Sequence, residues 1–430
     1  MNANGKDIYK TSRFLYILEA MLEYVISIFL GGAYIAKVTT SLGISDGVTG
    51  VIYAFGGLAS TFQLIAIFIA HKKPVKRWVT ICHTINQLFF ACVYLVPFFN
   101  FSKTTKIILF ISFLLLGNII NQVINAPKTN WFMSLIDDSK RGSFIAIKEF
   151  ISLIGGMIFS FIIGMVMDYY EAIGNNRAAF LFCSIGIIVL TVMHTGTLLF
   201  SKEKPAEKVG KTSIKKEFGE IVKNKGLWRI ILCSILWRVA SSISQSFYGT
   251  YQVKELAFSL TFVSVLSLLG VVFRAIVLRP IGKLADKSFV NTLKVCYLFG
   301  GLMFVVMMFT VPQNGKIFFI IYTLFQAIAG TGIDNCEMNL VYNIVKEELR
   351  TSALALRMAV SGIVGFVTTL AVSPLVTYIQ NNGNQFFGLN VYAQQVVSAL
   401  SALGVIILLL FLHKNEKKIN VKNKLEELGE

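Results

Sequence analysis

Four acidic side chains lie inside long apolar runs of this sequence, where ionisable groups are rare. Glu19 and Glu23 lie near the N-terminus, and Asp334 and Glu337 lie within the run QAIAGTGIDNCEMNLVYNIV. If all four faced lipid, the combined cost would be on the order of 10 kcal/mol, which equals the net stability of a typical domain. We therefore expect these acids to face protein or water.

Acids in such a place can do two kinds of chemistry. An unpaired carboxyl in a dry site takes up a proton readily, so it could couple the movement of a solute to a proton gradient. A carboxylate paired with Arg238 or Lys128 would stay ionised, and it would then serve as a gate or contact the solute. The sequence leaves both interpretations open.

The acids belong to polar stripes along four expected helices, because residues three or four apart share one helix face. The four stripes consist of Glu19 and Glu23; of Asn121, Asn125 and Lys128; of Arg238, Ser242 and Gln245; and of Gln326, Gly330, Asp334 and Glu337. Each stripe places groups able to bind a proton or a polar solute on one side of an otherwise apolar helix.

The composition is that of a membrane protein. Of the 430 residues, 55% are hydrophobic and 15% are charged, with a mean hydropathy of +0.67, whereas soluble domains carry about 25% charged residues. The net charge of +17 comes from Lys and Arg in short gaps between apolar runs, so we expect no nucleic-acid partner.

The six Cys lie in apolar runs without a metal-binding spacing, and the chain has no nucleotide-binding loop. We therefore expect no metal, no cofactor and no enzymatic activity.

A membrane-spanning helix needs about 20 mostly apolar residues, and this criterion predicts twelve spans. They lie near 14–36, 47–70, 78–99, 105–127, 144–167, 178–200, 228–252, 259–279, 292–312, 317–343, 353–378 and 391–412. The polar stripes fall in the first, fourth, seventh and tenth spans. Residues 1–200 and 227–413 would form two six-helix bundles, with a cytoplasmic linker at 201–226 and a cytoplasmic tail at 414–430.

Lys and Arg predict the orientation of these spans. They are concentrated in every second gap, most densely between residues 202 and 225, and are sparse in the gaps between. Cytoplasmic loops carry the excess of Lys and Arg, so both termini are expected in the cytoplasm of a multi-pass protein of the plasma membrane.

The two halves of the sequence are related by an internal repeat. RGSFIAIKEFISLIGG (Arg141–Gly156) aligns with RTSALALRMAVSGIVG (Arg350–Gly365), with a basic residue at the start of each segment. The same alignment places together Lys148 and Arg357, Asn125 and Asp334, and Lys128 and Glu337. An acidic residue in one half therefore matches a basic residue in the other.

The segment GKLADKSFVN (Gly282–Asn291), after the eighth span, resembles the loop signature of the major facilitator superfamily of secondary transporters. Gly282, Leu284, Asp286 and Lys287 match that signature. LGISDGVTGVIYAFGG and LIDDSKRGSF also resemble segments of this superfamily, whereas the first-half counterpart of the signature, AHKKPVKR, has lost its Gly and Asp.

The resemblance implies an all-α membrane protein whose twelve transmembrane helices form two six-helix bundles related by pseudo-twofold symmetry. It also implies that the first, fourth, seventh and tenth helices line a central cavity that holds the substrate and the proton. The expected cavity residues are Glu19, Glu23, Asn121, Asn125, Lys128, Arg238, Gln245, Asp334 and Glu337.

The function implied by the resemblance is secondary active transport of a small organic solute by alternating access. We expect protons as the coupling ion because of the acids within the spans, and a monomer as the working form. Two alternatives stay open: a drug-type efflux antiporter, and a membrane protein that moves or senses lipid without ion coupling. The fifth span, FISLIGGMIFSFIIG, lacks the Gly-Pro signature of drug antiporters, which weighs against the first alternative.

Charged residues at the cytoplasmic ends suggest a gate. We expect Arg141, Gly282, Asp286, Lys287 and Arg350 to contribute to it through ion pairs between loops and helix starts, although simple anchoring by positive charge explains Arg141 equally well. His83 and His194 are single histidines on apolar helices. For these two the sequence favours hydrogen-bonded packing over a role in proton transfer.

Overall fold

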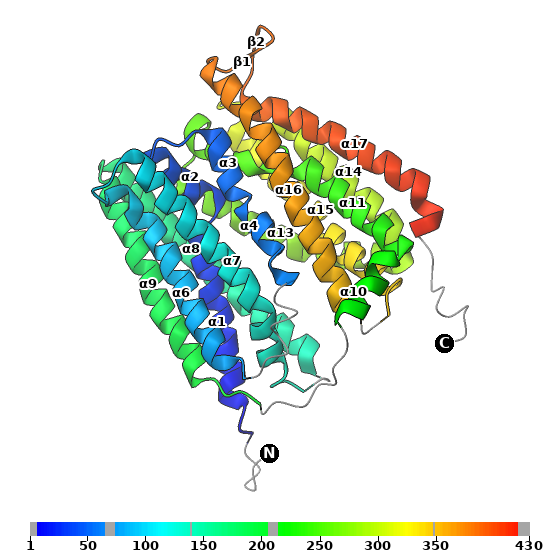
Figure 1. The fold of residues 1–430 in the computed structure, drawn as a ribbon. Coiled ribbons are helices and arrows are strands. Elements are labelled where there is room, and N and C mark those ends of the chain that lie inside the picture. The colour runs from blue at the N-terminus through cyan, green and yellow to red at the C-terminus, as the bar shows by residue number, and fades with distance from the viewer. Residues whose placement is uncertain (1–6, 65–73, 138–139, 205–213, 347–348, 420–430) are drawn as a thin grey trace. The chain divides into compact units, whose positions relative to one another are not determined.

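A computed structural model describes residues 7–64, 74–137, 140–204, 214–346 and 349–419. Most of the predicted tail and part of the predicted linker lie outside these residues, as does the end of the predicted span 47–70. The described part of the chain is almost entirely helical (Figure 1).

The helices of the first half of the chain lie close to the predicted spans. They are α1 (Lys10–Phe29), α2 (Gly32–Ser41), α3 (Asp46–Tyr53), α4 (Phe55–Ser60), α6 (Lys76–Leu95), η1 (Val96–Phe98), α7 (Lys103–Met133), α8 (Arg141–Ala172) and α9 (Asn176–Phe200).

The second half begins with the short helix α10 and ends with the long helix α17. Its elements are α10 (Ile214–Lys223), α11 (Lys225–Ser242), η3 (Gln245–Phe247), α12 (Tyr248–Thr250), η4 (Tyr251–Glu255), α13 (Leu260–Lys287), α14 (Phe289–Met308), α15 (Gly315–Tyr342), α16 (Arg350–Asn381), β1 (Gln385–Phe386), β2 (Leu389–Asn390) and α17 (Ala393–Ile419).

Within the described residues, ten spans are long and apolar enough to cross a membrane, and an eleventh results if α1 and α2 are counted as one bent span. The first predicted span is thus broken by 43°, because Gly31 adopts an extended conformation between the two helices. The break leaves the carbonyl of Phe29 without a helical partner, and the hydroxyl of Tyr94 on α6 donates a hydrogen bond to it.

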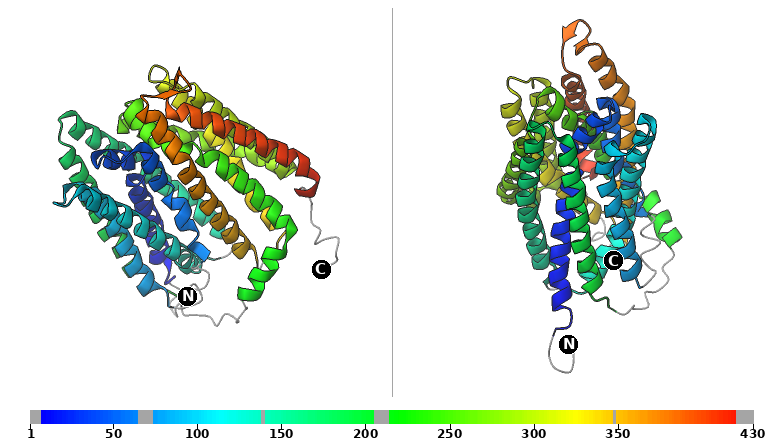
Figure 2. Two further views of the ribbon diagram at one scale, coloured as in Figure 1. Left: turned by 45° about the horizontal axis from the view of Figure 1, so that its top comes forward. Right: turned by 90° about the vertical axis from the view of Figure 1, so that its left-hand side faces the viewer.

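The chain divides into two compact units. The first contains residues 1–44, 65–210 and 259–264, and the second contains residues 45–64, 211–258 and 265–430. In the first unit α6 lies beside α7 and α9, and α1 lies beside α8 and α9 (Figure 1; Figure 2). These neighbours bring the polar residues of α1, α6, α7 and α9 together.

Small residues explain why α3 and α4 pack with helices from the other half of the chain. A Cβ atom on Gly362 of α16 would overlap the carbonyl oxygen of Gly57, and one on Gly50 would overlap the ring of Phe247. Such close contacts between backbones are typical of helices packed in membranes.

The beginning of α13 is held in the first unit by a carboxylate. Asp168 of α8 accepts hydrogen bonds from the backbone N–H groups of Leu260 and Thr261, at 2.7 and 2.8 Å. These N–H groups have no partner within α13 itself, so the carboxylate accepts their hydrogen bonds. Its negative charge is also attracted to the positive end of the helix dipole.

The glycine contact leads to a testable prediction. Alanine favours a helix over glycine, yet Gly362→Ala should lower the stability of the protein by about 1–3 kcal/mol because its methyl group has no room. The midpoint of thermal unfolding of the purified protein measures this effect. Gly56→Ala is the matched control, since a Cβ there meets no atom within 4 Å. Equal midpoints for both variants would contradict the packing described here.

Candidate functional site

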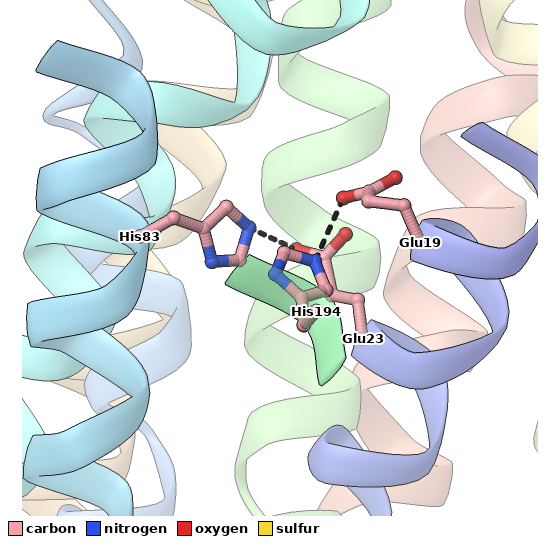
Figure 3. A group of neighbouring side chains, drawn as sticks. All are labelled: Glu19, Glu23, His83 and His194. Carbon is pink, nitrogen blue, oxygen red and sulfur yellow. Dashed lines mark hydrogen bonds and ion pairs between the residues drawn. The ribbon is translucent and has the colours of Figure 1, made fainter. Parts of the chain in front are cut away.

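A cluster of polar side chains lies in the interior of the first unit. Glu19 and Glu23 come from α1, His83 from α6, Lys128 from α7 and His194 from α9. Glu19, His83, Lys128 and His194 are each 2% exposed or less, whereas the side chain of Glu23 is 30% exposed. Figure 3 shows both imidazole rings turned toward the two carboxylates.

The ammonium group of Lys128 lies at the centre of the cluster. Its Nζ donates to Glu19 Oε1 at 2.7 Å, also bonds to Glu23 Oε2, and lies 3.1 Å from His83 Nε2. His194 Nε2 lies 3.0 Å from Glu19 Oε1, and His83 Nε2 lies 3.4 Å from Glu23 Oε1. Every member of the cluster therefore contacts at least one charged member.

The charges of this cluster do not cancel. Two carboxylates and one ammonium group leave one net negative charge when both histidines are neutral, and a buried charge without compensation is unfavourable. One added proton would neutralise the cluster. The two imidazole rings lie 4.3 Å apart between centroids, and the Nδ1 atom of each lacks a hydrogen-bond partner among the described residues. Neither ring is therefore fixed in one tautomer by a partner on that nitrogen.

Two carboxylates and two imidazoles are also the donor types that bind transition metals. The donor atoms of Glu19, Glu23, His83 and His194 all lie within 4.8 Å of one another. In this structure, however, the ammonium of Lys128 contacts three of these four residues. An internal cation thus lies where a metal ion would have to bind.

The second unit holds its own buried charge, Glu337 on α15, which is 2% exposed. Arg357 of α16 forms an ion pair with it. Tyr297 of α14 donates to Glu337 Oε1 at 2.7 Å, and Ser234 of α11 donates to its other oxygen. In contrast to the cluster around Lys128, this group of charges is balanced.

The two buried groups match under the internal repeat. Lys128 and Glu337 occupy aligned positions in the sequence, and each is bound by residues from the first and third predicted spans of its half of the chain, α1 and α6 or α11 and α14. Under the predicted repeat, each half therefore holds a buried ionic centre at this position, and the central charge has the opposite sign in the two halves.

Other residues expected to face the cavity are not part of these groups. Asn125, Arg238 and Asp334 are exposed, and Asn121 is partly buried. Gln245 donates to the hydroxyl of Tyr322 at 3.2 Å. The assignment of all these residues to one cavity stays a prediction.

The expected gate residues differ in their surroundings. Gly282, Asp286 and Lys287 lie on the last turns of α13, because the helix extends through the segment predicted to be a loop. Neither Asp286 nor Lys287 forms an ion pair with another described residue. The guanidinium of Arg350 lies 5.0 Å from the ring centroid of Tyr342, and Arg141 also has a polar or ring contact. The gate stays a prediction.

Sequence reasoning missed several members of the two buried groups. It treated His83 and His194 as packing residues, and it did not consider Ser234 and Tyr297. A single ionisable or hydroxyl residue on an apolar helix was the only signal available, and that signal does not identify partners on other helices.

Comparison with known proteins gives a family match. The family model described as "Major Facilitator Superfamily" matches residues 14–369. None of the curated proteins matches the sequence closely enough to count as a relative.

Solved structures share the fold at low sequence identity. A mutant of the nucleoside transporter NupG aligns with a TM-score of 0.75 and 14% identity, covering 94% of this chain and 99% of that one. A bacterial homologue of the human lysosomal transporter Spinster gives a TM-score of 0.69 and 14% identity, with 97% and 100% coverage. A D-xylose–proton symporter gives 0.67 and 15%, with 92% and 97% coverage.

The balance of charge around Lys128 can be tested through stability. Lys128→Met leaves two carboxylates close together without their cation, so we expect a loss of about 3–5 kcal/mol. Lys128→Met combined with Glu19→Gln should recover part of that loss, because one negative charge is removed. Thermal unfolding of the purified proteins compares the variants. If Lys128→Met alone is as stable as the native protein, the ammonium group of Lys128 does not hold the cluster together.

Proposed function

Because the chain belongs to the Major Facilitator Superfamily, we propose that it is a secondary transporter that moves a small organic solute by alternating access and couples this movement to protons. It is a multi-pass membrane protein with the fold of transporters, and no catalytic family matches it. We further propose that it works as a monomer in the plasma membrane, with both termini in the cytoplasm, and that it is not an enzyme.

The observation that supports proton coupling is that two carboxylates share one ammonium group in the first unit, which leaves one negative charge when both imidazoles are neutral. The ionisable groups that face one another are Glu19 and Glu23 from α1, His83 from α6, Lys128 from α7 and His194 from α9. Lys148 of α8 lies further out, over the ring of Tyr16 and paired with Glu149. Its charge is thus partly balanced by Glu149, and one site for a proton is left in the cluster itself.

The exposure of Glu23 suggests how the proton enters. Glu23 is the most exposed member of the cluster and contacts both His83 and Lys128, so a proton arriving there can pass to an imidazole. When the cluster is protonated it is neutral and stable in a dry interior. When the proton leaves, the negative charge favours contact with water. Protonation of the cluster therefore disfavours its contact with water, and contact with water in turn favours loss of the proton.

A polar organic solute agrees with several, though not all, of the structural neighbours whose names state a substrate. Two that agree are a nucleoside transporter and a D-xylose–proton symporter, and one that differs is a metal transporter. A drug-type antiporter and a lipid-moving protein have no specific observation in their favour among the described residues.

The coupling can be tested in proteoliposomes, after a panel of metabolites and drugs has identified a transported solute. Glu23→Gln and His194→Asn should abolish accumulation of the solute driven by a proton gradient, while exchange of solute without a gradient continues. Glu220→Gln, which changes an exposed acid on α10 outside the cluster, should leave both activities unchanged.

Two results would contradict this proposal. Accumulation at the native rate in both cluster variants would show that the cluster does not carry the proton. Movement of lipid rather than solute, without a gradient and without a change in pH, would favour the alternative of a lipid-moving protein.

A further inference from the structure

Two opposite charges in the second unit have no partner. Arg238 lies on α11 and Asp334 lies on α15, and both side chains are exposed. Neither forms an ion pair or a side-chain hydrogen bond with any other described residue. Glu337 and Arg357, on helices of the same unit, are by contrast paired with each other. The second unit therefore pairs Glu337 and leaves Arg238 and Asp334 without a charged partner among the described residues.

Both charges lie at membrane depth. With a rise of 1.5 Å per residue, Arg238 lies about 20 Å along α11 from its first residue, and Asp334 lies about 12 Å from the last residue of α15. Those two helix ends face the cytoplasm in the predicted orientation. The hydrocarbon core of a bilayer is about 30 Å thick. Exposure to lipid at such depths is strongly unfavourable for either side chain, so both should face water.

The backbone around them leaves room for a bound molecule. A Cβ on Gly365 of α16 would lie 2.8 Å from Arg238 Cδ, so this glycine lets the aliphatic part of the arginine pack closely while the side chain as a whole stays exposed. On α15, a Cβ on Gly330 would meet no atom within 4 Å. Gly330 lies one turn before Asp334 on the same face, so the helix surface one turn before Asp334 carries no side chain and is not covered by a neighbouring atom at that distance.

We propose that Arg238 and Asp334 select a zwitterionic solute, with Arg238 binding its carboxylate and Asp334 binding its amine. A guanidinium offers several N–H donors to a carboxylate, and a carboxylate accepts hydrogen bonds from an ammonium group. The helices that carry them, α11 and α15, are in contact, and the two side chains differ in depth by only about 8 Å. This inference rests on the proposed transport function and names its substrate class.

The test measures solute exchange without a proton gradient, so it does not depend on coupling. Proteoliposomes with the native protein receive amino acids and dipeptides, together with the same compounds carrying an amidated carboxylate or an acetylated amine. In the native protein, either modification should weaken binding at least about tenfold, because a charged hydrogen bond is lost.

The variants assign each end of the solute to one residue. Arg238→Gln should remove the preference for a free carboxylate and keep the preference for a free amine, and Asp334→Asn should do the reverse. Arg238→Lys should retain part of the carboxylate preference, which guards against a general loss of folding. Arg274→Gln, which removes another exposed arginine within a span of the same unit, should change neither preference.

The outcomes separate the two proposals. Equal exchange of zwitterionic and modified compounds by the native protein would overturn the inference and leave the transport function standing. Unchanged preferences in both Arg238→Gln and Asp334→Asn would also overturn it. If no solute of any charge class is exchanged, the transport function fails and the substrate class fails with it.

Discussion

The hydrocarbon core of a membrane provides no water to stabilise a charge, and this constraint explains how the ionisable groups of the protein are arranged. Lys128 is surrounded by acids and an imidazole, and Glu337 is paired with Arg357. Arg238 and Asp334 stay exposed without partners in the described part of the chain. The pairing of Glu337 removes the need for water, and the cluster around Lys128 reduces that need. The exposed charges of Arg238 and Asp334 require water, so a hydrated pathway is expected beside them.

The two units meet this constraint differently at matched positions. Glu337 receives one guanidinium and two neutral hydroxyl donors, so its charge is balanced and it has no need of a further proton. Lys128 instead faces two carboxylates and leaves them short of one positive charge. In a fold with two similar halves, one substitution of opposite sign can thus change which half holds a balanced group of charges.

The sequence predicted the long helices well and their mutual contacts poorly. Hydropathy predicts most span ends to within a few residues of the observed helix ends, because insertion in lipid depends on local composition. The cost of buried charge correctly predicted that Glu19 and Glu337 avoid lipid. Lys128, one of the two cations that the sequence offered as partners of the acids, pairs with Glu19. The histidine and hydroxyl partners could not be predicted, because contacts such as Glu19 with His194 depend on the rotation and depth of separate helices. The signature after the eighth span proved helical, since Ser288 caps the next helix and α13 continues to Lys287.

The contact between Gly57 and Gly362 brings two backbones close together. Beside it, the hydroxyl of Ser60 on α4 donates a hydrogen bond to the carbonyl of Met358 on α16 at 3.3 Å. A methyl group at position 362 would overlap this hydroxyl as well as the carbonyl oxygen of Gly57. One added carbon atom would therefore push the two helices apart and displace the bond that joins them.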